Sequence, residues 1–259
     1  MQIALVAPTY QEQDNIEGFL RAVRASLPAA TIIICDDNSP DGTGKLAEEV
    51  ALELGNIEVL HRPTKEGLGA AYRQGFRHAI DGGAEVVIQM DVDFSHPAQM
   101  LPALVAAVES GADVAIGSRY VPGGGTPDWS RHRRLLSHYG NIYARAQLRL
   151  VMRDSTSGFR AYRASILEDI NFDTTRANGY GFQIETAFRL TLVGADIVEL
   201  PLVFHDRVHG ISKMSVPIMV ENMALVTWWG LCLRAPKLTG RFRKTGAGRY
   251  LAERTTPST

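Results

Sequence analysis

Short apolar runs that end abruptly in acidic residues recur through the first half of the chain. The run Thr31 to Cys35 is rich in β-branched residues and is followed at once by Asp36 and Asp37. The run Val86 to Met90 is followed by Asp91-Val92-Asp93 in the same way. Continuous apolar runs of this length are typical of parallel strands that are buried on both faces. They restrict the chain to folds in which other layers cover both sides of a sheet.

Helix-like segments separate these runs. We expect strands at residues 2–7, 31–35, 57–61, 86–90, 113–117 and 197–200. We expect helices that begin near Asp14, as the N-cap, and after Gly67, and helices at residues 43–54, 97–110, 135–150, 164–170 and 183–193. Residues 153–160 and 204–213 are polar and turn-like. The alternation predicts an α/β fold with a mostly parallel sheet and helices on both faces.

The composition agrees with a soluble α/β protein. The 259 residues are 45% hydrophobic and 21% charged, and the formal net charge of -1 gives no overall field that favours nucleic acid. The two cysteines, Cys35 and Cys232, lie far apart in apolar surroundings and lack the spacing of a metal site. We therefore expect reduced thiols and a cytosolic compartment, and the N-terminal residues show no pattern of a secretory signal.

Polar side chains follow three of the expected strands where each strand ends. These clusters are Pro8-Thr9-Tyr10-Gln11-Glu12, Asp36-Asp37 and Asp91-Val92-Asp93. Ligands of open parallel sheets bind beyond the carboxyl ends of the strands, so we expect the three clusters to share one edge. Two carboxylates one residue apart point to the same side of a strand and suit a divalent cation that also binds phosphate oxygens. The alternative is that these acids are solvated turn residues.

Two glycine-containing segments resemble nucleotide-binding motifs but lack essential positions. Gly42-Thr-Gly-Lys45 has neither the earlier glycine nor the following Ser or Thr of a phosphate-binding P-loop. Gly67-Leu-Gly69 has no third glycine and no downstream acid of a dinucleotide-binding unit. We assign a phosphate-binding role to neither segment.

Cationic residues follow in the second half of the chain, in segments that we expect to be irregular or to start helices. They are Arg119, Arg133, Arg134, Arg160, Arg207 and Lys213. The planar guanidinium group suits phosphate because it donates two parallel hydrogen bonds. These residues are therefore candidates for binding a diphosphate, and the alternative is that they are solvated surface residues.

Several single residues have two interpretations. Tyr10, Glu12 and Asp37 are candidates for holding a nucleobase and ribose, but a strand-end tyrosine also packs on helices and acids also form turns. His96 is a candidate metal ligand or base, and it is equally suited to cap the helix that follows. The other histidines have neither the spacing of a zinc site nor the companions of a catalytic triad.

Seven short motifs in a fixed order resemble a known family. They are Pro8-Thr-Tyr-Gln-Glu12 with Asn15, Asp36-Asp-Asn-Ser-Pro-Asp-Gly-Thr43, Gly67-Leu-Gly69, Met90-Asp-Val-Asp-Phe-Ser-His-Pro97, Gly117-Ser-Arg-Tyr120, Ser157-Gly-Phe-Arg160 and Gly210-Ile-Ser-Lys213. This set is similar to the family-2 inverting glycosyltransferases of the GT-A fold, and within them it resembles the dolichol-phosphate (polyprenol-phosphate) mannose synthases. The resemblance covers about residues 3 to 215.

The resemblance implies transfer of mannose from GDP-mannose to a polyprenyl monophosphate, giving polyprenyl-phosphate-mannose and GDP. It places five residues in the guanosine pocket: Pro8, Tyr10, Glu12, Cys35 and Asp37. It assigns Mg²⁺ or Mn²⁺ and the diphosphate to Asp91, Val92 and Asp93, with Ser95 as a further metal contact. It gives the phosphates to Arg119, Arg207 and Lys213, and the lipid phosphate to Arg133 and Ser137, with Arg134 as the alternative to Arg133.

The chemistry of such an acceptor agrees with the residues present. A sugar hydroxyl acceptor requires a general base, whereas a phosphate monoester is already an anion at neutral pH. The enzyme then needs to align the acceptor and to stabilise the leaving nucleotide. Two other functions stay open: transfer of glucose or another hexose, and a non-catalytic subunit that binds sugar nucleotides.

The C-terminal part of the chain points to a membrane surface. We expect a catalytic domain at 1–215, an amphipathic interfacial helix at 216–235 and a basic, flexible tail at 236–259, where seven Lys and Arg and one Glu follow from Arg234 onward. The uncharged part, Met223 to Leu233, is shorter than the roughly 20 residues of a membrane span. Trp228 and Trp229 suit the interface, and the basic residues suit anionic lipid headgroups. We expect a peripheral protein on the cytoplasmic face with a separate membrane partner; the alternative is a helix that packs in the core.

Overall fold

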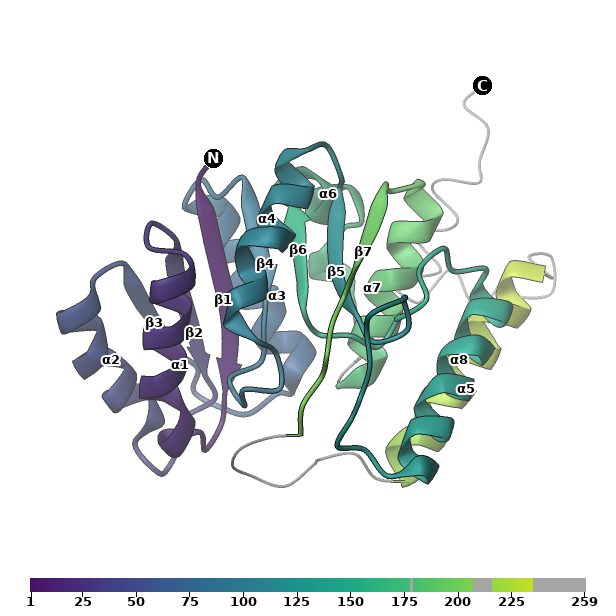
Figure 1. Ribbon diagram of the computed structural model, residues 1–259, viewed down its shortest axis with the longest axis horizontal. Helices are drawn as coiled ribbons and strands as arrows, with labels where there is room; N and C mark the ends of the chain where they lie inside the picture. Colours follow the sequence, from purple (N-terminus) through teal and green to yellow (C-terminus); the bar gives the residue numbers. More distant parts are fainter. Residues whose placement is uncertain (178, 207–215, 235–259) are drawn as a thin grey trace.

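The computed structural model describes residues 1–177, 179–206 and 216–234. Within them, a seven-stranded sheet forms the centre of the protein, in the order β3-β2-β1-β4-β6-β5-β7 (Figure 1). The strands are β1 (Ile3–Thr9), β2 (Thr31–Asp36), β3 (Ile57–His61), β4 (Val86–Gln89), β5 (Val114–Ser118), β6 (Arg160–Arg163) and β7 (Ile197–Pro201). The predicted α/β architecture with a mostly parallel sheet is confirmed.

Strand β6 is the exception in the sheet. It pairs antiparallel with β4 on one side and with β5 on the other, whereas the other neighbouring strands are parallel. Sequence analysis expected a turn through Arg160 and no strand after it, and that expectation is wrong. Arg160 and Tyr162 alternate with Ala161 and Arg163, so the strand lacks the continuous apolar run by which the other central strands were predicted.

Helices cover both faces of the sheet. The helices α1 (Gln13–Ser26), α2 (Thr43–Leu54) and α4 (Leu101–Glu109) pack on one face, and α3 (Leu68–Asp81), α6 (Ala164–Asp169) and α7 (Tyr180–Val193) pack on the other (Figure 1). Alternate strand residues serve the two faces: Leu5 faces the first layer and Val6 the second. Short 3₁₀ turns, η1 (Ala98–Met100) and η2 (Phe172–Thr174), complete the connections.

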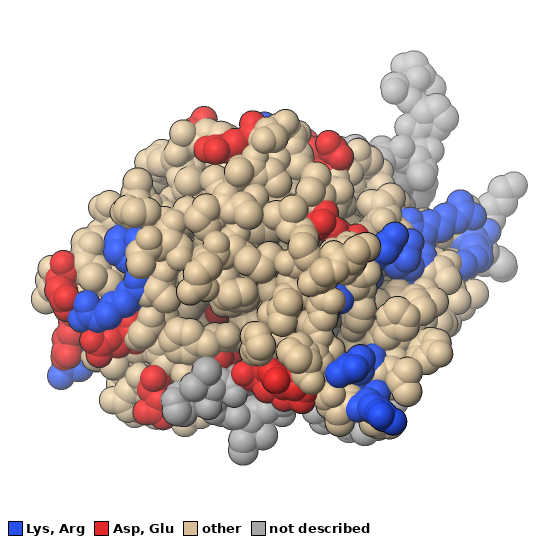
Figure 2. Space-filling view, viewed as in Figure 1, with Lys and Arg blue, Asp and Glu red and all other residues tan. Residues whose placement is uncertain are grey.

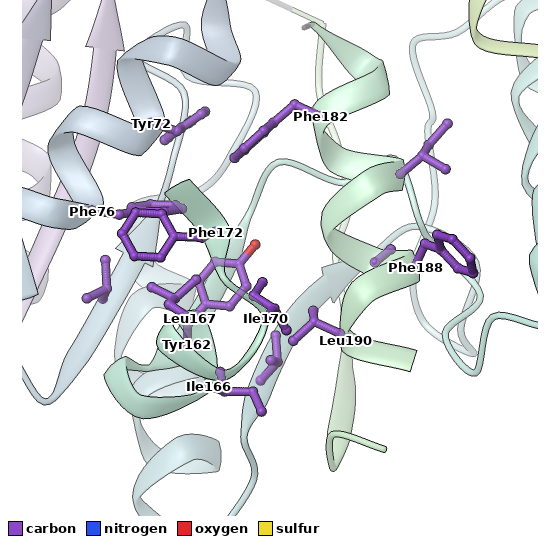
Figure 3. Close-up of a cluster of buried hydrophobic side chains, with 14 of the residues drawn as sticks. Tyr72, Phe76, Tyr162, Ile166, Leu167, Ile170, Phe172, Phe182, Phe188 and Leu190 are labelled. Carbon is purple, nitrogen blue, oxygen red and sulfur yellow. The ribbon is translucent and has the colours of Figure 1, made fainter. Parts of the chain in front are cut away.

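Aromatic rings join α3 and α7 beneath the sheet (Figure 3). The rings of Tyr72 and Phe182 lie parallel with centroids 5.7 Å apart. Phe76 meets Tyr162 of β6 edge to face at 5.7 Å and Phe172 at 5.9 Å. Stacked and edge-to-face pairs are the favoured arrangements of aromatic rings, so this cluster fixes the start of α7 relative to α3.

Helices α5 (Arg131–Leu148) and α8 (Val216–Arg234) pack against each other at one end of the protein (Figure 1). The helix predicted at 216–235 is present, but its apolar residues lie on more than one side. Val226, Trp229 and Cys232 are buried, and Trp229 stacks on Phe188 of α7 at 6.0 Å. On the other side Met223, Trp228 and Leu231 are about half exposed. One side of the helix therefore packs in the core, as the alternative expected, and the place of its open side at a membrane interface stays a prediction.

None of the helices formed by the described residues is long and apolar enough to span a bilayer.

Helix boundaries differ from the predictions at two site-bearing helices. The N-cap of α1 is Glu12 and not Asp14, because the Glu12 carbonyl already accepts from the backbone N–H groups of Asn15 and Ile16, at 2.9 Å each. Helix α5 begins four residues early, at Arg131, since the Ser130 hydroxyl caps it by accepting from the Arg133 N–H.

Candidate active site

The carboxyl ends of β1 and β2 bring the first two predicted clusters together. Asp36 accepts hydrogen bonds from Thr9 Oγ1 at 3.0 Å, from the Ser39 hydroxyl at 2.5 Å and from the Ser39 backbone N–H at 3.0 Å. These bonds make Asp36 the acid that shapes the turn. The neighbouring Asp37 is bound to β1 through its backbone N–H and the Thr9 carbonyl. Of the two interpretations of the acid pair, the turn role belongs to Asp36, and Asp37 is left as the candidate for nucleoside binding.

Arg62 is a site residue that sequence analysis missed. It follows β3 directly, is only 3% exposed, and its guanidinium pairs with the carboxylate of Asp37. It also donates to Gln74 at 3.0 Å and to Glu66 at 3.1 Å, so each of its three guanidinium nitrogens has a hydrogen-bond partner. Its position directly after an expected strand was the available signal. A buried arginine that fixes Asp37 leaves a rigid acid at the edge where a nucleoside is expected.

Tyr10 and Lys65 face each other at the same edge. The Lys65 ammonium lies 3.4 Å from the centre of the Tyr10 ring, a cation–π contact that the sequence did not suggest. Glu12 accepts from the Asn15 side chain at 2.8 Å. Pro8 and Cys35 are paired across β1 and β2. The thiol of Cys35 points into the core, where a Cβ on Gly75 would come within 2.7 Å of it, so only the Cys35 backbone faces the edge.

The Asp91-Val92-Asp93 segment leaves β4 in a tight turn. Asp93 Oδ1 accepts from the Ser95 hydroxyl at 2.5 Å and from its backbone N–H at 3.1 Å. Asp91 Oδ1 accepts from the Tyr72 hydroxyl at 2.9 Å. Between Asp93 and Ser95, Phe94 adopts φ 60°, a left-handed conformation that is uncommon outside glycine. Val92 is buried in the core, so its side chain turns away from the site.

His96 lies under this turn and supports it. Its Nδ1 accepts the Asp91 backbone N–H at 3.4 Å, and its ring stacks on Phe159 with centroids 5.0 Å apart. Burial lowers the pKa of His96 below the usual value, so the ring is neutral at pH 7. The residue that caps the following 3₁₀ turn is Pro97. His96 therefore serves neither as the helix cap nor, by its contacts, as a metal ligand or base. It is a buried residue that shapes the turn.

The turn offers the donor atoms that a hard divalent cation prefers. Asp91, Asp93 and Ser95 line one cavity and supply carboxylate and hydroxyl oxygens. Among the described residues, no group of three His, Cys, Asp or Glu side chains is placed to hold a metal. The two carboxylates alone would leave most positions of a six-coordinate cation to phosphate oxygens and water, as is usual for Mg²⁺ bound with a nucleotide. The residues fit such a cation.

The same cavity, of about 170 Å³, extends from the acidic turn to α5. Predicted residues from both halves of the chain line it together: Asp91, Asp93, Ser95, Arg119, Arg133 and Ser137. We call Tyr10, Asp37, Asp91 and Asp93 the donor edge, and Arg119, Arg133, Ser137 and Asn141 the acceptor wall. Beyond the acceptor wall the lining is apolar and includes Leu136 and Ala144 of α5, Ile184 of α7, and Met223 and Val226 of α8.

Arg119 forms a buried ion pair with Asp154. Its guanidinium donates to the two carboxylate oxygens at 2.7 and 2.6 Å, and its backbone N–H donates at 3.0 Å. Burial alone would raise the pKa of Asp154, but the charge and hydrogen bonds of Arg119 hold it below the usual value. Asn141 joins the same network by accepting from the Ser155 hydroxyl and backbone N–H at 2.8 Å. Arg119 thus keeps its cavity position through a partner 35 residues away.

Arg133 and Ser137 lie on the side of α5 that faces the cavity. Arg133 pairs with Asp206 at 2.7 Å and stacks on the Trp129 ring at 4.1 Å. The Tyr120 hydroxyl donates to Ser137 Oγ at 2.7 Å. Because Ser137 accepts that bond, its own proton is available for an acceptor in the cavity.

The remaining predicted cations lie elsewhere. Arg134 donates to the backbone carbonyls of Thr126 and Trp129 and lines a separate hollow together with Gly124 and Gly125. Arg160 is fully buried in β6 and donates to the Ser155 and Gln183 carbonyls, so its predicted place in an irregular, phosphate-binding segment is wrong. Arg207 and Lys213 lie outside the described residues.

The two glycine segments that were set aside have packing roles. A Cβ on Gly44 would come within 3.0 Å of the Asp36 carboxylate, and a Cβ on Gly69 within 2.7 Å of the Ala177 carbonyl. Gly69 therefore requires glycine because a backbone carbonyl approaches it closely, whereas at Gly44 the Asp36 side chain would have to shift slightly. A phosphate is not needed to explain either one.

A mostly parallel sheet with acidic residues at its strand ends is also the arrangement of solved glycosyltransferases with the GT-A fold. A mannosyltransferase from Pyrobaculum calidifontis, solved with GDP-Man and Mn²⁺, matches with a TM-score of 0.58 and 15% identity, over 100% of this chain and 76% of that one. Glucosyl-3-phosphoglycerate synthase from Mycobacterium tuberculosis, solved with Mn²⁺ and UDP, matches with a TM-score of 0.62 and 19% identity, over 90% and 79%. At these identities the likeness concerns the fold.

Sequence relatives narrow the class. Residues 4–171 match the family described as glycosyl transferase family 2. An undecaprenyl-phosphate mannosyltransferase from Micrococcus luteus is 43% identical over 93% of this chain and 99% of its own length. A polyprenol monophosphomannose synthase from Mycolicibacterium smegmatis is 42% identical over 92% and 91%. The chain belongs to glycosyl transferase family 2.

Proposed function

We propose that the protein transfers mannose from GDP-mannose to a polyprenyl monophosphate, with inversion at the sugar carbon, and releases GDP. The observation that carries this proposal is the single cavity that joins the acidic donor edge to the acceptor wall and continues into an apolar lining. A nucleoside diphosphate suits the acids together with a cation. A phosphate attached to a hydrocarbon suits Arg133 and Ser137 followed by the apolar residues of α5 and α8.

The acceptor phosphate supplies its own nucleophile. It is an anion at neutral pH, so the reaction requires alignment of its oxygen with the sugar carbon and not removal of a proton. His96, the histidine beside the acidic turn, accepts the Asp91 backbone N–H at Nδ1, so its ring lone pair is already occupied, which agrees with a reaction that needs no base. Arg133 and the Ser137 hydroxyl would hold the phosphate while Arg119, fixed by Asp154, contributes positive charge nearby.

Asp91 and Asp93 would hold Mg²⁺ or Mn²⁺ against the diphosphate of the donor. Bound there, the cation supplies Lewis-acid stabilisation of the charge that develops on the leaving GDP. Tyr10 and Asp37 lie one and two strands away along the same edge, where the nucleoside of that donor would extend. Arg62 would keep Asp37 in place for the base or ribose.

The exposed sides of α5 and α8 would rest on an anionic membrane surface. Seven of the eleven large apolar side chains that are exposed among the described residues lie on these helices: Leu135, Leu136, Tyr139, Ile142, Met223, Trp228 and Leu231. Lys and Arg side chains gather over the same helices in Figure 2. Apolar residues flanked by cations favour the interface of anionic lipids. Because residues of both helices line the cavity, a lipid acceptor would reach it from the membrane side of α5 and α8.

The activity is tested with labelled GDP-mannose and polyprenyl phosphate in detergent or vesicles, with and without Mn²⁺. We expect labelled lipid that is lost when the cation is chelated. A panel of UDP-glucose, UDP-galactose and GDP-mannose separates mannose transfer from transfer of another hexose. Binding of GDP-mannose without any labelled lipid, in the presence of Mn²⁺ and acceptor, would instead support the non-catalytic subunit and overturn the proposal.

Membrane attachment is tested by flotation with vesicles that contain anionic lipid. Deleting α8 is a poor test, because Trp229 and Cys232 belong to the core. Replacing Tyr139, Trp228 and Leu231 by serine keeps the core intact and is expected to reduce flotation strongly. The matched control is Leu52→Ser, since Leu52 is 91% exposed on the distant helix α2. Equal flotation of the triple variant and the control would remove α5 and α8 from the membrane contact.

A further inference from the structure

The Tyr72 hydroxyl reaches the acidic turn from beneath the donor edge. Tyr72 lies on α3, is fully buried, and donates to Asp91 Oδ1 at 2.9 Å. The phenol hydroxyl is therefore a hydrogen-bond donor to one oxygen of this carboxylate.

The ring that carries this hydroxyl is held on two sides. Phe182, in the first turn of α7, lies parallel to it at 5.7 Å, and Phe76 of α3 lies at 5.5 Å (Figure 3). Because close-packed aromatic side chains in a core occupy single rotamers, the position of the hydroxyl is set by the packing of α3 against α7. The hydrogen bond to Asp91 is thus made by a rigid group and not by a mobile one.

The other side of Asp91 is also defined. A Cβ on Gly158 would lie 3.4 Å from Asp91 Oδ2, so the chain that enters β6 passes close to the second oxygen. The Asp91 backbone N–H is bound to His96. One carboxylate oxygen is therefore fixed by Tyr72, and the rotation of the carboxylate plane is restricted by backbone and by ring packing.

We propose that Tyr72 is a positioning residue that sets the orientation of the Asp91 carboxylate for the divalent cation. The inference rests on the metal-dependent function proposed above. A hydrogen bond from outside the coordination shell orients a ligand before the metal arrives, and its loss commonly lowers metal affinity by about 10- to 100-fold. Tyr72 would act only through Asp91, since it is buried and does not line the cavity.

The test is Tyr72→Phe, which removes only the hydroxyl. Binding of Mn²⁺ is measured directly from the electron paramagnetic resonance of the free ion, with GDP present and with neither sugar nor lipid. We expect the dissociation constant for Mn²⁺ to rise by about tenfold. In turnover assays the Mn²⁺ concentration for half-maximal rate should rise by the same factor, while the rate at saturating Mn²⁺ stays close to wild type.

The matched control is Tyr162→Phe. Tyr162 is also fully buried in the same cluster, but its hydroxyl donates to Gln89 Oε1 at 3.0 Å and not to Asp91. A Mn²⁺ constant within twofold of wild type for Tyr72→Phe would overturn the proposal, and so would equal shifts in both variants, which indicate general loosening of the core. Wild-type protein that binds no Mn²⁺ would overturn the metal site itself, and the proposal with it.

A second variant tests the ring instead of the hydroxyl. Phe182→Leu removes the stacked partner of Tyr72 and leaves its hydroxyl in place. We expect a smaller rise of the Mn²⁺ constant than for Tyr72→Phe, about threefold. No rise, in protein whose unfolding midpoint shows that it is folded, would contradict the claim that ring packing sets the position of the hydroxyl.

Discussion

The donor edge and the acceptor wall meet in one cavity but are assembled over different distances along the chain. At the donor edge, Asp93 is bound by Ser95, two residues away, and Asp36, which shapes the turn beside Asp37, is bound by Ser39, three residues away. At the acceptor wall, Arg119 is bound by Asp154 and Arg133 by Asp206, over 35 and 73 residues. Of the donor-edge acids, Asp93 is held within its own turn, whereas Asp91 and Asp37 are also held by Tyr72 and Arg62, 19 and 25 residues away. The acceptor wall exists only when distant segments have packed.

The two regions also differ in the sign of their charged side chains. Asp91 and Asp93 line the cavity at the donor edge, where a cation would join them to the diphosphate, and Arg119 and Arg133 line it at the acceptor wall. A side chain bound within its own turn can be replaced with little loss of stability. Removing one partner of a buried ion pair leaves the other charge buried and unpaired, which lowers the stability strongly. The comparison therefore predicts that changes at the donor edge reduce turnover with little loss of stability, and that changes behind the acceptor wall reduce stability as well.

The largest effect is expected from Asp93→Ala at the donor edge. Loss of a cation ligand should lower kcat/KM by about 10⁴-fold, which corresponds to about 5.4 kcal/mol of transition-state stabilisation. The unfolding midpoint should change little, because Asp93 accepts from Ser95 within its own turn, two residues away. Steady-state assays across Mn²⁺ concentrations measure the loss, with Asp41→Ala as the control acid that only caps a turn. Metal-dependent activity retained in Asp93→Ala would contradict the assignment.

Asp154→Ala should have the largest effect on stability. It leaves the Arg119 charge buried without its partner, which costs about 3–5 kcal/mol of unfolding free energy. Urea unfolding measures the change. The control is Glu53→Gln, which breaks the exposed Arg21–Glu53 pair and should cost less than about 1 kcal/mol. Similar losses in the two variants would mean that the acceptor wall does not depend on its buried pair.

Tyr120→Phe should have a moderate effect that is confined to the acceptor. Without the Tyr120 hydroxyl, Ser137 is free to turn its proton away from the cavity, at a cost of about 1 kcal/mol. We expect KM for polyprenyl phosphate to rise about fivefold while KM for GDP-mannose stays constant. Ser110→Ala, which removes an exposed hydroxyl at the end of α4, is the control. A rise in both KM values would show that the two regions are not separate.

The smallest effect concerns Cys35, behind the donor edge. Burial raises the pKa of its thiol to about 12, so iodoacetamide at pH 8 should leave it unmodified in the native protein, as mass spectrometry would show. A folded pKa above the unfolded one of 9.0 means that the folded state keeps its proton longer. This contribution to stability is complete below pH 9 and is lost as the pH rises toward 12. Rapid alkylation at pH 8 would show that the donor edge opens.

The difference in sequence distance also explains which parts could be predicted. The sheet, its helices and the shared edge of Tyr10, Asp37, Asp91 and Asp93 followed from local patterns, and the sheet is confirmed. Strand β6 was missed because its four residues include Arg160 and Arg163, whose type says nothing about burial. Arginine is rarely buried unless its donors are satisfied, and the carbonyls that satisfy Arg160 become neighbours only in the folded chain.

The positioning residues were missed for a related reason. Arg62, Tyr72 and Asp154 act on predicted site residues that lie 25, 19 and 35 positions away. Nothing in the sequence distinguishes Tyr72 from a core tyrosine, since ring and hydroxyl serve packing and hydrogen bonding at once. His96 was assigned a role in chemistry or capping because only the fold shows Phe159 stacked against it.

The antiparallel strand β6 also determines the order in which the active site can be completed during synthesis. β1, β2 and β4 lie within the first 89 residues, so the donor edge can form early, as domains fold from the N-terminus. The second edge of β4 stays unpaired until β6 is synthesised, about 70 residues later. An unpaired strand edge can pair with another chain and so promotes aggregation. Helix α8, which closes the cavity, emerges last. During synthesis the donor edge can therefore form before the part of the cavity that is lined by α8.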